Sequence, residues 1–383
     1  MPAVELGDML GHARCHGYAV GAFTVPGLEV ARGVLAAAER ARAPVVLVVD
    51  PTTDEEAALE SLLAGLVTAV DAASVPAAIL YGPVSDARAV RRAARLGCGG
   101  VLARPPEGEF TATVAALREQ VAEASTCRLT VIACPQPDES GRTPAAEATA
   151  LCQRTGSHAL EVAITGASGE GRRARTDYSR LRQLGEATEC PLVVPADGTD
   201  TDDRIRRMVA QGAAQIGFSE GLSRTAAEAL RATAPAYENL GRAVRDAVSA
   251  WSGERMRTMG SAGRAAEVLS RCRERRAVEE LLIQDAAPSE ALEQTVRAGE
   301  ATLRAAPGVR AVYGYRVGGA QGESQVVWRV ELCHPAAREE FGAHLRQLPG
   351  ERIRHLPLEP AGACAQARAT EEVPDHVLAG SNG

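Results

Sequence analysis

The chain has 383 residues and a net charge of −7, and 45% of its residues are hydrophobic while 24% are charged. This length and composition predict a soluble globular protein with two domains. The acidic balance and an aromatic content of 3% argue against nucleic-acid binding. Nine cysteines without a C-x-x-C pair favour a reducing compartment over a disulfide framework. Since no run of about 18 apolar residues and no leader-like segment occurs, we expect a cytoplasmic protein that does not bind membranes.

Residues 1 to about 235 alternate apolar, strand-like runs with amphipathic, helix-like segments. Eight such runs, each followed by a helix pattern, predict an α/β fold, the (β/α)₈ TIM barrel, with its active-site loops after the carboxyl ends of the strands. An open doubly wound sheet is the alternative, and the count of strands favours the barrel. The predicted strands are 19–25, 44–50, 76–81, 99–103, 129–134, 159–164, 191–195 and 215–218, and the predicted helices include 29–42, 86–96, 144–153, 202–211 and 223–232.

The pattern changes after about residue 238. A helical extension over 238–259 leads into a connector rich in Arg and Glu. A βαββαβ order follows, which is typical of a ferredoxin-like fold. Its segments are 278–284, 289–306, 309–317, 325–332, 336–347 and 351–357. We therefore predict a barrel domain (1–265), a linker (266–277), a smaller α+β ferredoxin-like domain (278–359) and a disordered tail (360–383).

Sequence stretches at both ends of the predicted barrel carry a family pattern. The first is GYAVGAFTV at 17–25, followed by APVVL at 43–47, and the second is GSAGR at 260–264. They resemble the class II fructose-bisphosphate aldolases and the related tagatose-bisphosphate aldolases, over about residues 1–265. The resemblance implies a TIM barrel in which zinc, held mainly by histidines, polarises a ketose carbonyl while an aspartate moves the proton.

The resemblance breaks down at the residues that carry this chemistry. Pro83, Gly169 and Pro195 stand where the family has zinc-binding histidines, and the segment Tyr81-Gly82-Pro83-Val84 also lacks the catalytic aspartate. Proline and glycine have no side chain that binds a metal. All 42 basic residues are Arg, so no Lys is present to form a Schiff base. We therefore expect neither a metal nor another cofactor in the barrel.

Polar residues at the predicted strand ends point to a rebuilt pocket. Arg104 could pair with Asp50 or Asp197, either as a catalytic group or as a structural ion pair. Glu170 and Asp197 could act as acid and base, or they could be solvated loop acids. The proposed catalytic residues are Asp50, Arg104, Glu170 and Asp197, and the proposed substrate-binding residues are Thr24, Tyr81, Ser168, Gly198, Thr199 and Ser219.

Two other groups of side chains have simpler interpretations. Cys134 ends a predicted strand, but no histidine at a neighbouring strand end could activate it, so a core thiol is the better interpretation. His12 and His16 are four residues apart on the first predicted helix, outside the family's metal site. We expect them to be a surface pair.

Residues 278–359 resemble the dimeric α/β-barrel superfamily, which includes antibiotic-biosynthesis monooxygenase-like domains. The resemblance rests on the order of elements, on Trp328 and on LCHP at 332–335. It implies that two copies pair their sheets, so we expect a homodimer, through this domain or the barrel. A ligand pocket is the alternative, and Tyr313, Tyr315, Trp328 and His334 could line it.

Three functions remain open at this point. The chain could be a lyase-like enzyme of secondary metabolism that acts on a small carbonyl or carboxylate compound without metal or Schiff base. It could instead be an inactive scaffold or regulatory partner of another protein, or its chemistry could belong to the C-terminal domain. New polar residues at many strand ends favour the enzyme.

Overall fold

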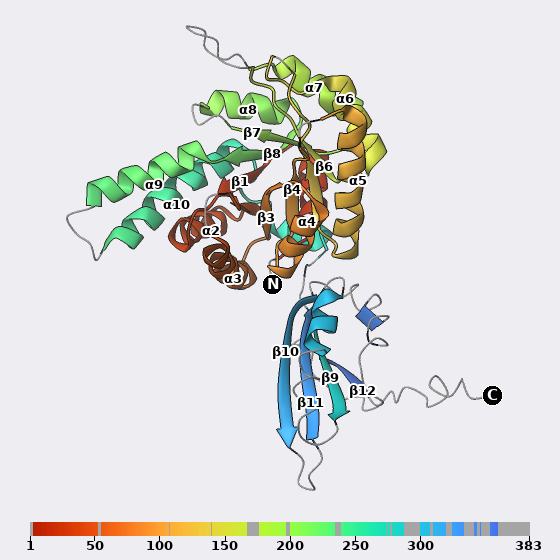
Figure 1. Ribbon diagram of the computed structural model, residues 1–383. Helices are drawn as coiled ribbons and strands as arrows, with labels where there is room; N and C mark the ends of the chain where they lie inside the picture. Colours follow the sequence, from red (N-terminus) through yellow and green to blue (C-terminus); the bar gives the residue numbers. More distant parts are fainter. Residues whose placement is uncertain are drawn as a thin grey trace.

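Eight parallel strands form a closed barrel in the computed structural model (Figure 1). The strands pair in chain order and β8 closes on β1, which confirms the predicted TIM barrel. The structure describes residues 3–52, 55–106, 108–138, 140–166, 176–196, 200–233, 239–273, 275, 278–286, 299–306, 309–318, 324–332, 341–342, 345 and 353–358. The barrel strands are β1 (Val20–Thr24), β2 (Val45–Val49), β3 (Ala77–Val84), β4 (Gly100–Ala103), β5 (Thr130–Ala133), β6 (Ala159–Glu161), β7 (Leu192–Pro195) and β8 (Ala213–Phe218).

Two barrel strands end well away from their predicted carboxyl ends. β3 continues to Val84, past its predicted end at residue 81, whereas β6 ends at Glu161 instead of residue 164. The early end of β6 has a local cause. The Ala163 N–H donates to Thr143 Oγ1 at 2.9 Å, and the Thr143 N–H donates to the Ala163 carbonyl at 2.9 Å. A loop thus takes the place of a neighbouring strand beyond Glu161.

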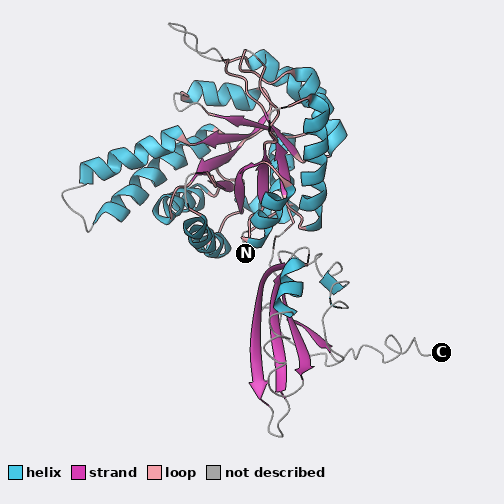
Figure 2. Cartoon of the chain, viewed as in Figure 1, coloured by secondary structure: helices cyan, strands magenta, loops and turns pink. Residues whose placement is uncertain are grey.

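Helices surround the barrel and connect its strands (Figure 2). The five predicted helices are confirmed, with small shifts at their ends. One boundary is fixed by a side chain, because Asp86 accepts a hydrogen bond from the Ala89 N–H at 2.8 Å and so caps α4. The helices are α1 (Leu6–His16), α2 (Leu28–Ala41), α3 (Glu56–Ala72), α4 (Ala87–Arg95), α5 (Phe110–Thr126), α6 (Ala145–Thr155), α7 (Tyr178–Ala187), α8 (Asp202–Ala210), α9 (Glu220–Thr233), α10 (Leu240–Thr258) and α11 (Ala265–Arg271).

Helix α1 closes the amino end of the barrel. Its Gly7 N–H donates to Thr130 Oγ1, at the first residue of β5, over 2.8 Å. Leu6 and Met9 are fully buried and share one apolar cluster with Ile132 and other interior side chains of the strands. Burial of each such side chain stabilises the fold by about 1.5–3 kcal/mol. α1 is therefore a plug at the end opposite to the loops that follow the strands.

Helix α10, the predicted extension, packs along α2 at a glycine. A Cβ added at Gly33 would lie 2.8 Å from Val248 Cγ1 and 2.9 Å from the Arg245 carbonyl oxygen. α9 and α10 lie side by side (Figure 1). No described helix has both the length and the hydrophobicity needed to cross a membrane.

Four antiparallel strands form a second sheet in the order β10-β11-β9-β12 (Figure 2). Trp328 is fully buried there among Leu282, Val312 and Phe341, so it belongs to the core and lines no open pocket. Residues 299–305 are helical. Most of the predicted helix at 336–347 and the whole tail 360–383 lie outside the described residues, so the ferredoxin-like fold stays a prediction. The strands are β9 (Val278–Ala286), β10 (Val309–Gly318), β11 (Ser324–Leu332) and β12 (Ile353–Leu358).

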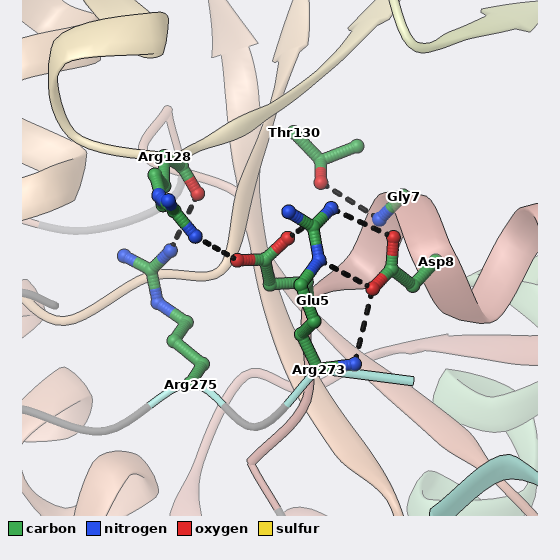
Figure 3. A network of polar contacts seen from close by, with 7 residues as sticks. All are labelled: Glu5, Gly7, Asp8, Arg128, Thr130, Arg273 and Arg275. Carbon is green, nitrogen blue, oxygen red and sulfur yellow. Dashed lines mark hydrogen bonds and ion pairs between the residues drawn. The ribbon is translucent and has the colours of Figure 1, made fainter. Parts of the chain in front are cut away.

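The segment between the barrel and β9, expected to be a linker, begins with helix α11. Val268 of this helix is fully buried in the interior cluster. Figure 3 shows how the following arginines bind the base of the barrel. Arg273 donates to both Asp8 oxygens at 2.9 and 3.0 Å and lies 2.8 Å from Glu5 Oε2, while Arg275 donates to the Arg128 carbonyl at 2.8 Å. The described part of the segment is therefore fixed to α1 and its neighbours.

One pair of cysteines is joined. Cys152 of α6 and Cys190, which precedes β7, form a disulfide, a pairing that the sequence pattern did not predict. The two residues are 38 positions apart, and only the packing of consecutive barrel units brings them together. Cys15 is an exposed free thiol, and the other free cysteines among the described residues are buried.

Candidate active site

Strand pairing decides which side chains enter the barrel mouth. Glu161 pairs with Val193, whose side chain belongs to the interior cluster, and Cys134 is a member of the same cluster. Ala22 of β1 also faces the interior, so Thr24, two residues further on, lies on the same side. These positions are at the carboxyl ends of the strands, where TIM-barrel enzymes place their active sites.

Arg104, Cys134 and Glu161 meet at this end, and we call them the mouth cluster. Arg104 Nη2 donates to Glu161 Oε1 at 3.1 Å, and its Nε donates to Cys134 Sγ at 3.3 Å. The Cys134 thiol donates to the same Glu161 oxygen at 3.1 Å. The Glu161 side chain is 16% exposed and that of Arg104 48%. The Glu161 side chain is therefore largely enclosed, while about half of the Arg104 side chain remains open to solvent.

The protonation state of Cys134 limits what the cluster can do. Burial, with the negative charge of Glu161, raises the pKa of its thiol to about 12. At neutral pH the sulfur keeps its proton, which agrees with a core thiol and not with a nucleophile. The reactive groups are then a guanidinium, which binds carboxylate or phosphoryl oxygens, and a carboxylate, which can accept a proton.

Several predicted site residues have other roles in the structure. Arg104 pairs with Glu161, a partner that the sequence did not predict, and its pairing with Asp50 or Asp197 stays a prediction. Asp50 Oδ1 accepts hydrogen bonds from the Thr52 N–H at 2.8 Å and from its hydroxyl at 2.6 Å, which forms a local turn. Thr24 is half-buried at the end of β1. The residues Ser168, Glu170, Asp197, Gly198 and Thr199 lie outside the described residues.

Tyr81 and Ser219 also need separate accounts. Tyr81 packs in the cluster between strands and helices and is 3% exposed, whereas Leu80 faces the barrel interior. Burial raises the pKa of its hydroxyl. Its side chain therefore points to the helices and not into the barrel interior, because successive side chains of a strand point to opposite faces, and its part in substrate binding stays a prediction. Ser219 is exposed, and its carbonyl accepts the Ser223 N–H at 2.9 Å in the first turn of α9.

Sequence reasoning missed Glu161. The run 159–164, ALEVAI, predicts an apolar strand, and Glu161 is its one charged residue. A carboxylate in a buried strand needs a partner, so the signal was present. Only the fold shows that this partner is Arg104.

Two of the three positions compared with zinc ligands are described. Pro83 lies within β3, and Pro195 is the last residue of β7. Neither side chain carries a donor atom, so these residues do not fit a zinc ion. Gly169 lies outside the described residues.

Comparison with known proteins agrees with the fold and the sequence pattern. The family model for class II fructose-bisphosphate aldolase matches residues 4–264, more than half of the chain. This chain belongs to the class II fructose-bisphosphate aldolase family. The family match ends just before α11. A relative, fructose-bisphosphate aldolase from Thermus caldophilus, is 27% identical over 235 residues, which are 56% of this chain and 75% of the relative.

Solved structures of similar proteins are aldolases as well. The YdjI aldolase from Escherichia coli K12 superposes with a TM-score of 0.64 at 22% identity, over 69% of this chain and 99% of that one. Fructose-bisphosphate aldolase from Campylobacter jejuni gives a TM-score of 0.59 at 10% identity, over 68% and 96%. At these identities the likeness supports the barrel fold alone.

Proposed function

We propose that this aldolase-family protein is a lyase-like enzyme of secondary metabolism. Its barrel mouth would act on a small carbonyl or carboxylate metabolite without zinc. The observation that carries the proposal is the mouth cluster, in which the half-exposed Arg104 lies 3.1 Å from the enclosed Glu161. Arg104 would hold an anionic oxygen of the substrate, and Glu161 would move a proton at the adjacent carbon. Asp50, Glu170 and Asp197 are further candidates for the acid or base.

The residue types support chemistry without a resident metal. Pro83, Gly169 and Pro195 offer no metal-binding side chain, and no Lys is present for an imine intermediate. Negative charge that develops on a carbonyl oxygen then needs another cation. A guanidinium meets this need because it stays charged at every physiological pH.

Thermal unfolding against a ligand library tests the proposal. The compounds are phosphosugars, keto acids, aromatic phenols, haem and zinc. A compound present at a hundred times its Kd stabilises the folded protein by about 2.7 kcal/mol. We expect a keto acid or phosphosugar to raise the melting temperature, and Arg104→Gln to abolish this rise.

A surface arginine provides the control. Arg91 pairs with Glu123 at 2.7 Å on the helical surface, so Arg91→Gln should keep the ligand response. Glu161→Gln should still bind the ligand. Once the substrate has been identified, this variant should show no turnover. A response to a keto acid or phosphosugar that Arg104→Gln leaves unchanged would contradict the assignment.

The other two functions predict different results in the same experiment. No response to any organic compound of the library would favour an inactive scaffold or regulatory partner. A response to haem or phenols that persists in Arg104→Gln would favour a site in the C-terminal sheet.

For the C-terminal part we propose a ferredoxin-like domain that pairs two chains. The order β10-β11-β9-β12 agrees with a βαββαβ chain, and Trp328 forms a compact core. The mass in solution, from light scattering, should be twice that of the chain, and a monomer would contradict the pairing. The proposal includes a cytoplasmic location for this protein.

A further inference from the structure

His12 and His16 are not the simple surface pair that their spacing suggested. Both lie on α1, at the base of the barrel, and their rings stack with centroids 3.9 Å apart. The His12 side chain is only 5% exposed, and that of His16 is 27% exposed. Glu267 of α11 faces both rings. The two helices are thus joined by two imidazoles and one carboxylate, which we call the base cluster.

The Nδ1 atom of each ring is engaged in a hydrogen bond, so the Nε2 atoms are the candidate metal ligands. His16 Nδ1 lies 2.8 Å from the His12 carbonyl, and because a carbonyl can only accept, this nitrogen carries the proton. His16 Nε2 therefore presents a lone pair. His12 Nδ1 is 2.9 Å from the Tyr18 hydroxyl, while its Nε2 is buried without any hydrogen-bond partner. Metal-binding histidines are commonly held in this way, through a hydrogen bond at the other ring nitrogen.

The spacing of the three candidate ligand atoms suits a small metal ion. Glu267 Oε1 lies 3.4 Å from His16 Nε2 and 3.7 Å from His12 Nε2, and all three atoms lie within 4.8 Å of one another. These distances are long for hydrogen bonds. Two ligands of a tetrahedral zinc ion with bonds of about 2.0–2.1 Å are about 3.3 Å apart. The two rings are stacked, with 15° between their planes, so both must turn about their side-chain torsions for the two Nε2 lone pairs to point at one ion.

Neighbouring residues both help and oppose a cation. Glu267 Oε2 accepts a hydrogen bond from Arg264 Nη1 at 2.9 Å, which orients the carboxylate and leaves Oε1 available. Arg271 is the opposing group, since its Nη1 lies 3.2 Å from His16 Nε2. Its side chain is exposed and can turn into solvent.

We propose that His12, His16 and Glu267 bind a divalent transition metal, with zinc as the reference ion, at the base of the barrel. The donor set of two imidazoles and one carboxylate is one that zinc accepts, with a water as the fourth ligand. The site lies at the end opposite to the barrel mouth, so its role is structural. It fastens α11, and with it the chain that leads to the second sheet, onto α1.

Metal titration of the full-length, EDTA-treated protein tests this site. Zinc binding is measured by calorimetry, and cobalt binding by the visible absorption of a tetrahedral ion. We expect His16→Ala and Glu267→Gln to remove one bound equivalent or weaken its affinity by at least about 100-fold. Arg271→Ala should instead tighten binding, because it frees His16 Nε2 and removes a positive charge. A purely structural ion pair would not give this opposite response.

The matched control is Asp8→Asn, which removes a carboxylate from the same helix outside the base cluster and should leave the metal stoichiometry unchanged. Far-UV circular dichroism verifies that each variant is folded. Equal binding by the native protein, His16→Ala and Glu267→Gln would overturn the proposal, as would the absence of binding in Arg271→Ala. The test is independent of the barrel mouth, because Arg104→Gln should not alter metal binding.

Discussion

Cys134 shows how one contact sets the chemistry of a side chain. Its thiol lies in a buried position and donates to the carboxylate of Glu161 at 3.1 Å. Loss of the proton would place two negative charges side by side in a region with little water, so the thiol form is strongly favoured. Cys134 therefore acts as a hydrogen-bond donor to Glu161 and not as a nucleophile.

This protonation state predicts the alkylation behaviour of the protein. With a pKa of about 12, only about 1 in 10,000 Cys134 thiols is ionised at pH 8, and thiolate is the reactive form. Iodoacetamide should modify the exposed Cys15 first and leave Cys134 intact. Glu161→Gln lowers the pKa of Cys134 and should speed its modification several-fold. Peptide mass spectrometry over time measures both rates, and early modification of Cys134 in the native protein would contradict the assigned state.

At the scale of elements, close helix packing depends on small residues. α2 and α10 approach each other at Gly33, where a Cβ would contact the backbone of the other helix. A glycine in the middle of a helix otherwise costs about 0.5–1 kcal/mol relative to alanine. The close approach of the two helices explains why this position has no side chain.

Two glycine substitutions separate these effects. In Gly33→Ala the new methyl group would lie 2.8 Å from Val248 Cγ1, so we expect a loss of about 1–3 kcal/mol in the free energy of unfolding. Gly11, within α1, has nothing within 4 Å of an added Cβ, and Gly11→Ala should add about 0.5–1 kcal/mol. Urea unfolding of both variants measures the difference. Equal effects would show that packing at Gly33 is not tight.

At the scale of the whole molecule, the segment after α11 is attached to the barrel by charges as well as by apolar packing. Arg273 is bonded to Asp8 and lies close to Glu5 (Figure 3). The side chain of Arg273 is 62% exposed, so salt should weaken these contacts. The described contacts after α11 therefore depend on ionic conditions.

The same contacts predict a dependence on pH. The hydrogen bond from Arg273, opposed by burial, holds the pKa of Asp8 below its ordinary value. The unfolded chain then binds this proton more readily than the folded one. The stabilisation is fully present above the unfolded-state pKa of about 3.9 and is lost as the pH falls through the lower, folded-state pKa.

Thermal melts of Arg273→Gln measure this effect. The variant should melt below the native protein at pH 6, and the difference should shrink towards pH 3. Arg182→Gln serves as the control, because Arg182 is exposed and lies 4.0 Å from its neighbour Glu186, and it should change little at either pH. A difference for Arg273→Gln that is constant with pH would show that Asp8 is not its partner.

Sequence alone determined the barrel and its helices. Apolar runs and amphipathic segments are local patterns that the sequence shows directly. Eight consecutive strand–helix units can bury their apolar side chains in only a few folds. The four strands of the second sheet followed from alternation and turns in the same way. Strand ends were less certain, since the end of β6 depends on Thr143, which comes from a loop.

Only the tertiary structure decided which side chains meet. Arg104 and Glu161 are 57 positions apart, and the orientation of Tyr81 depends on the side of its strand that faces the helices. The disulfide of Cys152 with Cys190 and the base cluster likewise join distant segments. The periodicity of the sequence predicts that a residue is buried or lies at a strand end. It does not predict the distance between residues of different elements. Such contacts arise when the barrel closes and α11 packs against α1.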